Sequence, residues 1–171
     1  MPSQMKEQKR DWGKGMATVG RTKVCSMHKH HFGPIPGIEV GTQWLFRISV
    51  AEDGIHLPHV AGIAGTEAVG CQSLVISGGD EDDVDEGEQF TYTGSGGRDL
   101  TGNRRTAEQS FDQTLTKVNA AIAKNCHAKF DPKNGGDAGA DWKKGKEIRV
   151  VRGADKKKKH VNRFAPSEGY R

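Results

Sequence analysis

Residues 77–105 of the chain have the sequence SGGDEDDVDEGEQFTYTGSGGRDLTGNRR. The stretch combines an acidic loop, a tyrosine, a glycine-rich turn and a pair of arginines. Glycine lets the backbone approach a ligand closely, a carboxylate can accept hydrogen bonds from a nucleobase amino group, and an aromatic ring can stack on a base. Arginine can hold phosphates or enter a groove of a duplex. The stretch therefore predicts a pocket for one base beside residues that grip the nucleic-acid backbone.

The size and composition of the chain indicate one loop-rich domain. It has 171 residues, of which 33% are hydrophobic and 23 are glycine, enough for a core but untypical of a helical bundle. No apolar run approaches the roughly 18 residues of a membrane helix, and residues 1–10 lack the apolar region of a secretory signal. Three widely spaced cysteines, Cys25, Cys71 and Cys126, argue against a disulfide scaffold and fit a reducing compartment.

Charge is unevenly distributed along the chain. Seven acidic residues lie between positions 80 and 88, and setting them aside raises the net charge from +4 to +11. Between residues 143 and 163, ten lysines and arginines accompany two acids. A basic body with one acidic loop favours a polyanionic partner, because neutralising phosphates supplies most non-specific affinity for DNA. The four lysines at 156–159 are equally well explained as a solvated loop.

Hydrophobic patterns predict an α+β fold that is mainly β. Residues 43–50 alternate between apolar and polar side chains, as in a half-buried strand. Further strands are expected at 71–77, 89–93 and 146–152, with a short strand or loop at 60–63 and a long loop at 127–145.

One amphipathic helix is expected over residues 106–125. Thr106 and Gln109 form a capping-box pattern at its start. Apolar side chains recur at spacings of three or four, the pattern of a helix that faces a core: Ala107, Phe111, Leu115, Val118, Ile122 and Cys126. We interpret this stripe as core packing.

The residue patterns for catalysis and metal binding are incomplete. A calcium loop starting at Asp82 would have Val84 at its third position and Thr93 at its twelfth, where oxygen ligands are required. The glycine run lacks the Lys-Ser/Thr of a phosphate-binding loop. No second ligand pair at zinc-finger spacing accompanies the cluster of Cys25, His28, His30 and His31. We therefore expect no cofactor, no metal and no enzymatic activity in this chain.

Six motifs resemble those of a known domain family. They are 31–37 (HFGPIPG), 59–63 (HVAGI), 78–85 (GGDEDDVD), 90–105, 106–110 (TAEQS) and 165–169 (APSEG). Through them the chain resembles SRA domains (SET- and RING-associated, also called YDG), especially those of the UHRF-type E3 ubiquitin ligases. The resemblance extends over about residues 12–171, and the block from Thr91 to Gln109 is its most specific part.

The resemblance implies an architecture and a domain boundary. The expected fold is a curved, PUA-like β-barrel with flanking helices that sits on DNA like a saddle. Residues 13–171 would form this domain, after a disordered lead or linker at 1–12. The family's Tyr-Asp-Gly motif and closing strands follow the point where this chain stops, so we expect C-terminal strands to be missing.

The resemblance also implies a function. Members of the family bind 5-methylcytosine, often in hemimethylated CpG, and flip the base out of the duplex into a pocket. The implied partners are double-stranded DNA with modified cytosine and, through the parent protein, histones or a DNA methyltransferase in the nucleus; no membrane partner is implied. Two alternatives stay open: a degenerate module that binds DNA without methyl discrimination, and the targeting domain of a ubiquitin ligase or histone methyltransferase.

Position by position, the resemblance assigns a base pocket. Asp83 would accept a hydrogen bond from the cytosine N4 amino group, and Tyr92 would stack on the flipped base. Thr93 and the backbone near Gly78 and Gly79 would bond to the base edge. Ser77 occupies a pocket position that is often alanine in the family, so it would make the space for the methyl group tighter or more polar.

Two loops would enter the duplex from opposite sides. Val60 would lie on a thumb loop, although a place in the core would also suit this residue. The finger loop would carry Asn103, which monitors the neighbouring base pair, then Arg104, then Arg105, which fills the vacated space. Arg47 and Arg98 are further candidates for phosphate contacts, with ordinary surface charge as the alternative.

Asp80 departs from the family's pattern. The family usually has a tyrosine directly after the two glycines, and this tyrosine provides a second stacking face for the base. Stacking between a base and an aromatic ring is worth about 1–3 kcal/mol, which is comparable to the cost of flipping. We therefore expect Asp80 to weaken the binding of methylcytosine.

Overall fold

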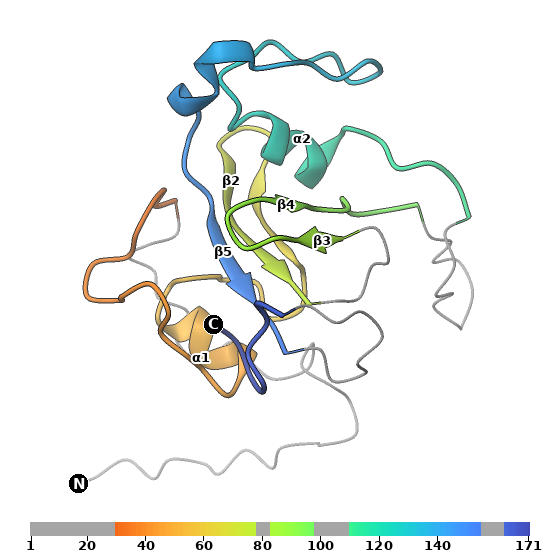
Figure 1. The fold of residues 1–171 in the computed structure, drawn as a ribbon. Helices are drawn as coiled ribbons and strands as arrows, with labels where there is room; N and C mark the ends of the chain where they lie inside the picture. Colours follow the sequence, from red (N-terminus) through yellow and green to blue (C-terminus); the bar gives the residue numbers. More distant parts are fainter. Residues whose placement is uncertain (1–29, 78–82, 98–109, 155–162) are drawn as a thin grey trace, which may run out of the picture.

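The computed structural model describes residues 30–77, 83–97, 110–154 and 163–171 (Figure 1). Several predicted features lie outside these ranges: the site residues at 78–80, 98 and 103–105, and the start of the helix at 106–109. The described elements, in chain order, are α1 (Arg47–Glu52), β1 (Ile63–Thr66), β2 (Gly70–Ile76), β3 (Val84–Asp85), β4 (Phe90–Thr91), α2 (Lys117–Ala123), the 3₁₀-helix Gly139–Lys144 and β5 (Arg149–Arg152).

A three-stranded mixed sheet forms the centre of the molecule, with strand order β1-β2-β5. The strands β1 and β2 are antiparallel, and β2 and β5 are parallel. Every residue of β2 is buried, as expected for a middle strand covered on both faces. The strands predicted at 71–77 and 146–152 are confirmed by β2 and β5, and the α+β class is confirmed as well.

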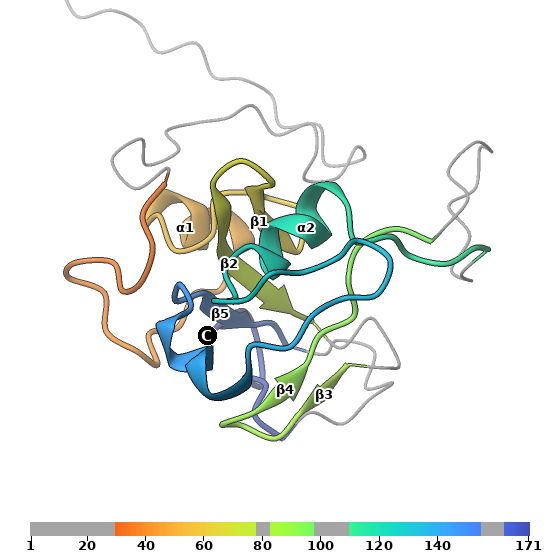
Figure 2. The ribbon, with the colours of Figure 1, turned by 90° about the horizontal axis from the view of Figure 1, so that it is seen from above.

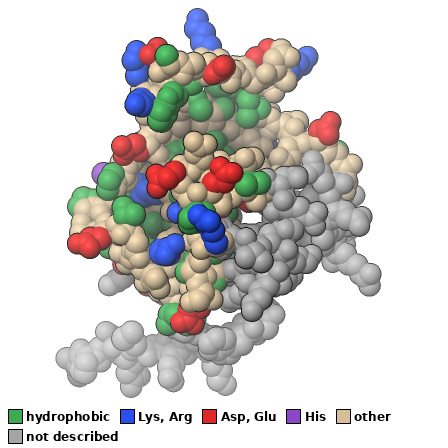
Figure 3. Space-filling model, viewed as in Figure 1, with side chains coloured by type: hydrophobic (Ala, Val, Ile, Leu, Met, Phe, Trp, Pro, Cys, Tyr) green, Lys and Arg blue, Asp and Glu red, His purple; other side chains and the backbone are tan. Residues whose placement is uncertain are grey.

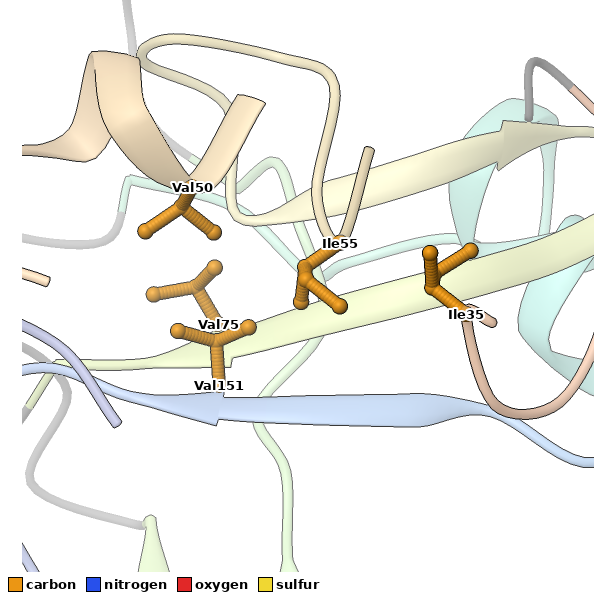
Figure 4. Packing of buried hydrophobic residues seen from close by; sticks show 5 residues of the cluster. All are labelled: Ile35, Val50, Ile55, Val75 and Val151. Atoms are coloured by element: carbon orange, nitrogen blue, oxygen red, sulfur yellow. The ribbon is translucent and has the colours of Figure 1, made fainter. Parts of the chain in front are cut away.

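Two hydrophobic clusters use opposite faces of β2. Successive side chains of a strand point to opposite faces, and Leu74 and Val75 accordingly belong to different clusters. The α1 cluster consists of Ile35, Val50, Ile55, Val75 and Val151, and Figure 4 shows Val50 facing the valines of β2 and β5. The α2 cluster consists of Ile63, Cys71, Leu74 and Ala121.

The predicted strand at 43–50 is wrong. Trp44 makes only an isolated bridge to Tyr170, and the chain then enters α1 at Arg47. Val50 and its neighbour Ala51 are both fully buried, whereas Phe46 is exposed. Burial at positions 47, 50 and 51 follows helical spacing. The alternation of apolar and polar residues in the sequence concealed this spacing, because the helix is only six residues long.

The predicted helix at 106–125 is too long. Within the described part, residues 110–116 are irregular and α2 begins only at Lys117. The φ angle of Lys117 is 52°, which a right-handed helix cannot continue through. Phe111, expected in the apolar stripe, is 59% exposed. The segment before α2 instead forms hydrogen bonds with Gly94 and Gly97, a tertiary contact that local periodicity does not reveal.

A short hairpin lies beside the sheet and carries part of the predicted base pocket (Figures 1 and 2). Its strands β3 and β4 pair antiparallel, with Val84 opposite Thr91 and Asp85 opposite Phe90. The strand predicted at 89–93 is confirmed by β4, although only two of its residues are in the ladder.

Candidate nucleic-acid interface

The hairpin brings Asp83 and Thr93 together. The register of β3 and β4, continued by one residue, places Asp83 opposite Tyr92. The backbone N–H of Thr93 donates a hydrogen bond to Asp83 Oδ1 at 2.5 Å. An ionised carboxylate only accepts hydrogen bonds, so this contact orients the Asp83 side chain while keeping its chemistry as an acceptor. Ten residues separate the partners in sequence, and the family resemblance predicts that both belong to one pocket.

Tyr92 is anchored by the core. Its partly buried ring packs against the α2 cluster. Its hydroxyl lies against Gly62, where an added Cβ would come within 2.8 Å of the phenol oxygen. The glycine at 62 is therefore needed for the tyrosine to occupy this position. Anchoring of this kind fixes the plane of the ring.

The other wall of the predicted pocket begins where β2 ends. Ser77 is the exposed residue that follows β2. Gly78, Gly79 and Asp80 come next and lie outside the described residues. The structure therefore describes Ser77, Asp83, Tyr92 and Thr93 of the predicted pocket.

The predicted thumb loop is a rigidly supported turn. Val60 is 61% exposed, which excludes the alternative that it belongs to the core. The loop backbone is held from beneath, because Arg47 donates through Nε to the Pro58 carbonyl at 3.1 Å and through Nη2 to the Ala61 carbonyl at 2.7 Å. His56 Nε2 also contacts the Ala61 carbonyl, at 2.9 Å. The loop thus presents an apolar side chain on a fixed backbone.

The burial of Arg47 argues against the phosphate contact predicted for it. Its side chain is only 8% exposed, and its guanidinium lies over the ring of Tyr170 in addition to holding the thumb loop. Burial lowers the pKa of Arg47 from its ordinary value, and the neighbouring tyrosines oppose this shift. The sequence pattern predicted residue 47 within a half-buried strand, and this error concealed the role of its side chain.

His56 is a buried residue that the sequence analysis missed. It is fully buried, and its Nδ1 lies 2.9 Å from Ser73 Oγ. With Nε2–H donating to the Ala61 carbonyl, Nδ1 is left to accept from the Ser73 hydroxyl. Burial, aided by the positive charge of Arg47, lowers the pKa of His56 to about 3. The imidazole is therefore neutral at physiological pH. A polar residue inside the apolar run 55–58 was the available signal.

The described ends of the predicted finger segment are tied together. The N–H groups of Ser110 and Phe111 both donate to the Gly97 carbonyl, at 2.6 and 3.1 Å. The Asn119 side chain, from α2, accepts from the Ser95 N–H and donates to the Ser95 and Thr114 carbonyls. These hydrogen bonds hold residues 95–97 close to residues 110–114.

The hairpin is also tied to β5 through Arg152. Its Nε donates to Asp85 Oδ2 at 2.7 Å and its Nη2 to Asp85 Oδ1 at 3.0 Å. The same Nη2 reaches the Gly87 carbonyl at 2.9 Å. The side chain of Asp85 is 3% exposed, and its hydrogen bonds raise the pKa of Arg152. No feature of the sequence indicated this pair, since 67 residues separate the partners.

Part of the predicted basic surface has internal roles. Arg149 donates to the carbonyls of His31, Gly33 and Ile55, and Arg152 binds Asp85. On the face in Figure 3, acidic and basic side chains are interspersed. The lysines at 156–159 lie outside the described residues. Within the described ranges, the excess of positive charge available to a polyanion is therefore smaller than the sequence alone indicated.

The described residues also bear on the enzyme, metal and membrane hypotheses. Cys71 is buried, which raises the pKa of its thiol to about 11 and disfavours a nucleophilic role. In the ranges that the structure covers, no three His, Cys, Asp or Glu residues form a candidate metal site; Cys25 and His28 lie outside them. Among the same residues, every helix is too short or too polar to serve as a transmembrane span.

Comparison with known proteins identifies related domains. A family model described as SAD/SRA domain matches residues 31–171. The chain is 56% identical over 172 residues to "E3 ubiquitin-protein ligase UHRF1" of Danio rerio and 51% identical to "E3 ubiquitin-protein ligase UHRF2" of Homo sapiens. All of the chain is aligned, but it spans only 22% and 21% of these relatives. The chain thus spans about a fifth of the length of the curated relatives it matches.

Two solved structures share the fold. A "Modification dependent TagI restriction endonuclease" has a TM-score of 0.63 and 32% identity, covering 82% of this chain and 41% of that one. The "SUVH5 SRA bound to fully hydroxymethylated CG DNA" has a TM-score of 0.52 and 26% identity, covering 81% of this chain and 73% of that one.

Proposed function

Since the chain belongs to the SAD/SRA domain family, we propose that it reads modified cytosine in double-stranded DNA by flipping the base, with hemimethylated CpG as the preferred site. The observation that carries the proposal is the hairpin geometry. It places a carboxylate acceptor, Asp83, on the strand opposite Tyr92, whose ring the core holds in place. The SUVH5 domain with which this chain shares its fold was solved bound to hydroxymethylated CG DNA.

The pocket would recover the energy that flipping costs. Extruding a base from the duplex costs a few kcal/mol. Tyr92 would return about 1–3 kcal/mol by stacking, and Asp83 would accept a hydrogen bond from the N4 amino group. The Thr93 amide keeps the carboxylate aimed, so little rotamer entropy is lost on binding. The backbone at Gly78 and Gly79 and the side chain of Ser77 would close the pocket around the methyl group.

The two loops would stabilise the duplex that the base has left. Val60 would enter from one groove, on a backbone fixed by Arg47 and His56. Arg105 would fill the vacated space and Asn103 would monitor the adjacent pair. Arg104 and Arg98 are the remaining candidates for backbone contacts.

The chain would act as a binding domain. Ubiquitin-ligase or methyltransferase chemistry, and contacts to histones or to a DNA methyltransferase, would belong to other segments of a longer protein that works in the nucleus. We place the reading domain at residues 13–171.

One experiment tests the reader hypothesis directly. Fluorescence anisotropy would measure the affinity of the protein for unmethylated, hemimethylated and fully methylated duplexes of one sequence, at several salt concentrations. We expect the hemimethylated duplex to bind most tightly, and Asp83→Asn to remove that preference. Glu67→Gln is the matched control, since it removes one negative charge from an exposed turn at the opposite end of β2. Equal affinities for all three duplexes, with a steep salt slope, would leave only phosphate binding.

A DNA-binding domain without methyl discrimination is the second candidate, and Asp80 is the residue that favours it. Asp80→Tyr would restore the second stacking face and should tighten binding of a methylated CpG duplex. An unchanged affinity would show that residue 80 does not face the base.

A further inference from the structure

We infer that Arg152 is a positioning residue for base recognition, because it joins the two walls of the predicted pocket through Asp85. The inference rests on the proposed function and assigns a role to a residue outside the pocket itself. Its basis is the geometry of β5, β2 and the hairpin.

Arg152 lies where both walls begin. It is the last residue of β5, and its backbone pairs with Ile76 at the end of β2. The next residue along the chain from Ile76 is Ser77, which opens one wall. The side chain of Arg152 extends to Asp85 in β3, two residues after Asp83 in the other wall. The Arg152 side chain therefore helps to set the distance between these walls, together with the packing of Tyr92 against the core.

The contact is specific in geometry as well as in charge. The guanidinium makes two parallel hydrogen bonds to one carboxylate, and a third to the Gly87 carbonyl in the turn. Asp85 Oδ1 also accepts from the Gly87 N–H at 2.9 Å. A planar fork fixes both distance and orientation, which a lysine ammonium cannot reproduce. Arg152 thus holds the strand and the turn of the hairpin as one unit.

The rest of the turn is packed against the same side chain. Phe164 lies beneath Arg152, with the guanidinium carbon 5.9 Å from the ring centroid. Gly87 has a φ of 92°, and a Cβ there would come within 2.8 Å of the Phe164 ring. Backbone hydrogen bonds between Arg152 and Arg171 hold the start of the side chain, at 2.7 and 2.8 Å. The contact between Arg152 and Asp85 is therefore supported at the backbone of Arg152 and at the hairpin turn.

A positioning role predicts a loss of selectivity that exceeds any loss of general DNA affinity. A base pocket needs its acceptor and its stacking ring at fixed distances from the opposite wall. Phosphate contacts elsewhere on the domain do not depend on this separation. Loosening the tie should therefore reduce the preference for methylated DNA while leaving the salt-dependent component unchanged.

The test compares Arg152→Lys with Arg149→Lys. Both substitutions keep the positive charge in β5, but Arg149 holds the carbonyls of His31, Gly33 and Ile55 and does not contact the hairpin. Anisotropy would give the ratio of affinities for hemimethylated and unmethylated duplexes. The fluorescence of 2-aminopurine beside the methylcytosine would report flipping. We expect Arg152→Lys to lower the affinity ratio on the order of tenfold and to reduce the 2-aminopurine signal, with both retained in Arg149→Lys.

A second variant keeps the test decisive if Arg152→Lys folds poorly. Asp85→Asn removes the charge of the partner while keeping its shape, and should lower the same ratio. Urea unfolding of each variant would confirm that the titrations use folded protein. Two outcomes would overturn the positioning role while leaving the proposed function intact. In one, the wild type is selective and both variants keep that selectivity. In the other, Arg149→Lys loses as much selectivity as Arg152→Lys. A wild type that binds all duplexes equally overturns the proposed function and this inference with it.

Discussion

Acidification should destabilise this domain through His56. The imidazole is fully buried and accepts from the Ser73 hydroxyl while donating to the Ala61 carbonyl. A proton added at Nδ1 would remove that acceptor and place a cation beside Arg47. The native protein therefore holds the pKa of His56 at about 3, below the ordinary value of 6.5.

The size of the effect follows from proton linkage. Below pH 6.5 the unfolded chain binds a proton at His56 that the native state refuses, so stability falls as the pH decreases toward 3. Above pH 7 both states are neutral and the contribution is fully present. Between pH 7.5 and pH 5 the loss amounts to about 2 kcal/mol. A shift of the native pKa by one unit scarcely changes this figure, because pH 5 lies well above it.

Urea unfolding at a series of pH values would measure this loss. His56→Gln removes the titrating group, and we expect it to be less stable than the wild type at pH 7.5 because buried partners lose hydrogen bonds. Its disadvantage should then shrink by about 2 kcal/mol on going to pH 5. His127→Gln is the control, since His127 is exposed and its removal should leave the wild-type pH profile intact. Parallel pH profiles for the wild type and His56→Gln would refute the reasoning.

Three further substitutions test other parts of the structure. Asn125→Ala should lower the free energy of unfolding by about 2–4 kcal/mol, measured in urea, because the buried amide bonds to both the N–H and the carbonyl of Cys71 in β2. Gly87→Ala should lower the melting temperature, since residue 87 combines a φ of 92° with the contact to Phe164. Val60→Ala should weaken DNA binding in anisotropy titrations while leaving the melting temperature unchanged, because the side chain is 61% exposed.

Each of these has a matched control. Asn134→Ala removes an exposed amide that bonds to the Asp131 side chain, and should cost little stability. Gly37 also has a positive φ, 85°, but no atom lies within 4 Å of a Cβ added there. If Gly87→Ala lowers the melting temperature no more than Gly37→Ala does, the packing argument is contradicted. Val40→Ala removes another exposed valine, and an equal loss of DNA affinity there would remove the special role of Val60.

Local sequence was sufficient where a feature depends on neighbouring residues. The buried strand β2 and the shorter β4 and β5 were predicted from their composition and spacing. The family resemblance predicts one pocket for Asp83 and Thr93, which stays a prediction, and the structure joins the two residues by a hydrogen bond. The family motifs also predicted the SAD/SRA domain that the family model matches.

Local sequence failed where burial decided the conformation. The alternation at 43–50 is typical of a strand, yet α1 begins at Arg47, with Val50 packed against the sheet and Ala51 fully buried. The apolar stripe from residue 107 predicted a long helix, but residues 110–113 bond to the backbone of Gly94 and Gly97, and the helix begins only at Lys117. In both cases tertiary contacts outweigh a local preference that is worth only a fraction of a kcal/mol per residue.

The sequence by itself determined which family the domain belongs to, and the family motifs predicted which side chains meet a base. Only the tertiary structure decided how those side chains are held. Arg47 and His56 support the thumb loop, and Arg152 joins the hairpin to β5. The physical reason is that the value of a buried charged or polar group depends on its partners and on its exclusion from water. These partners lie up to 67 residues away along the chain, and only folding brings them together.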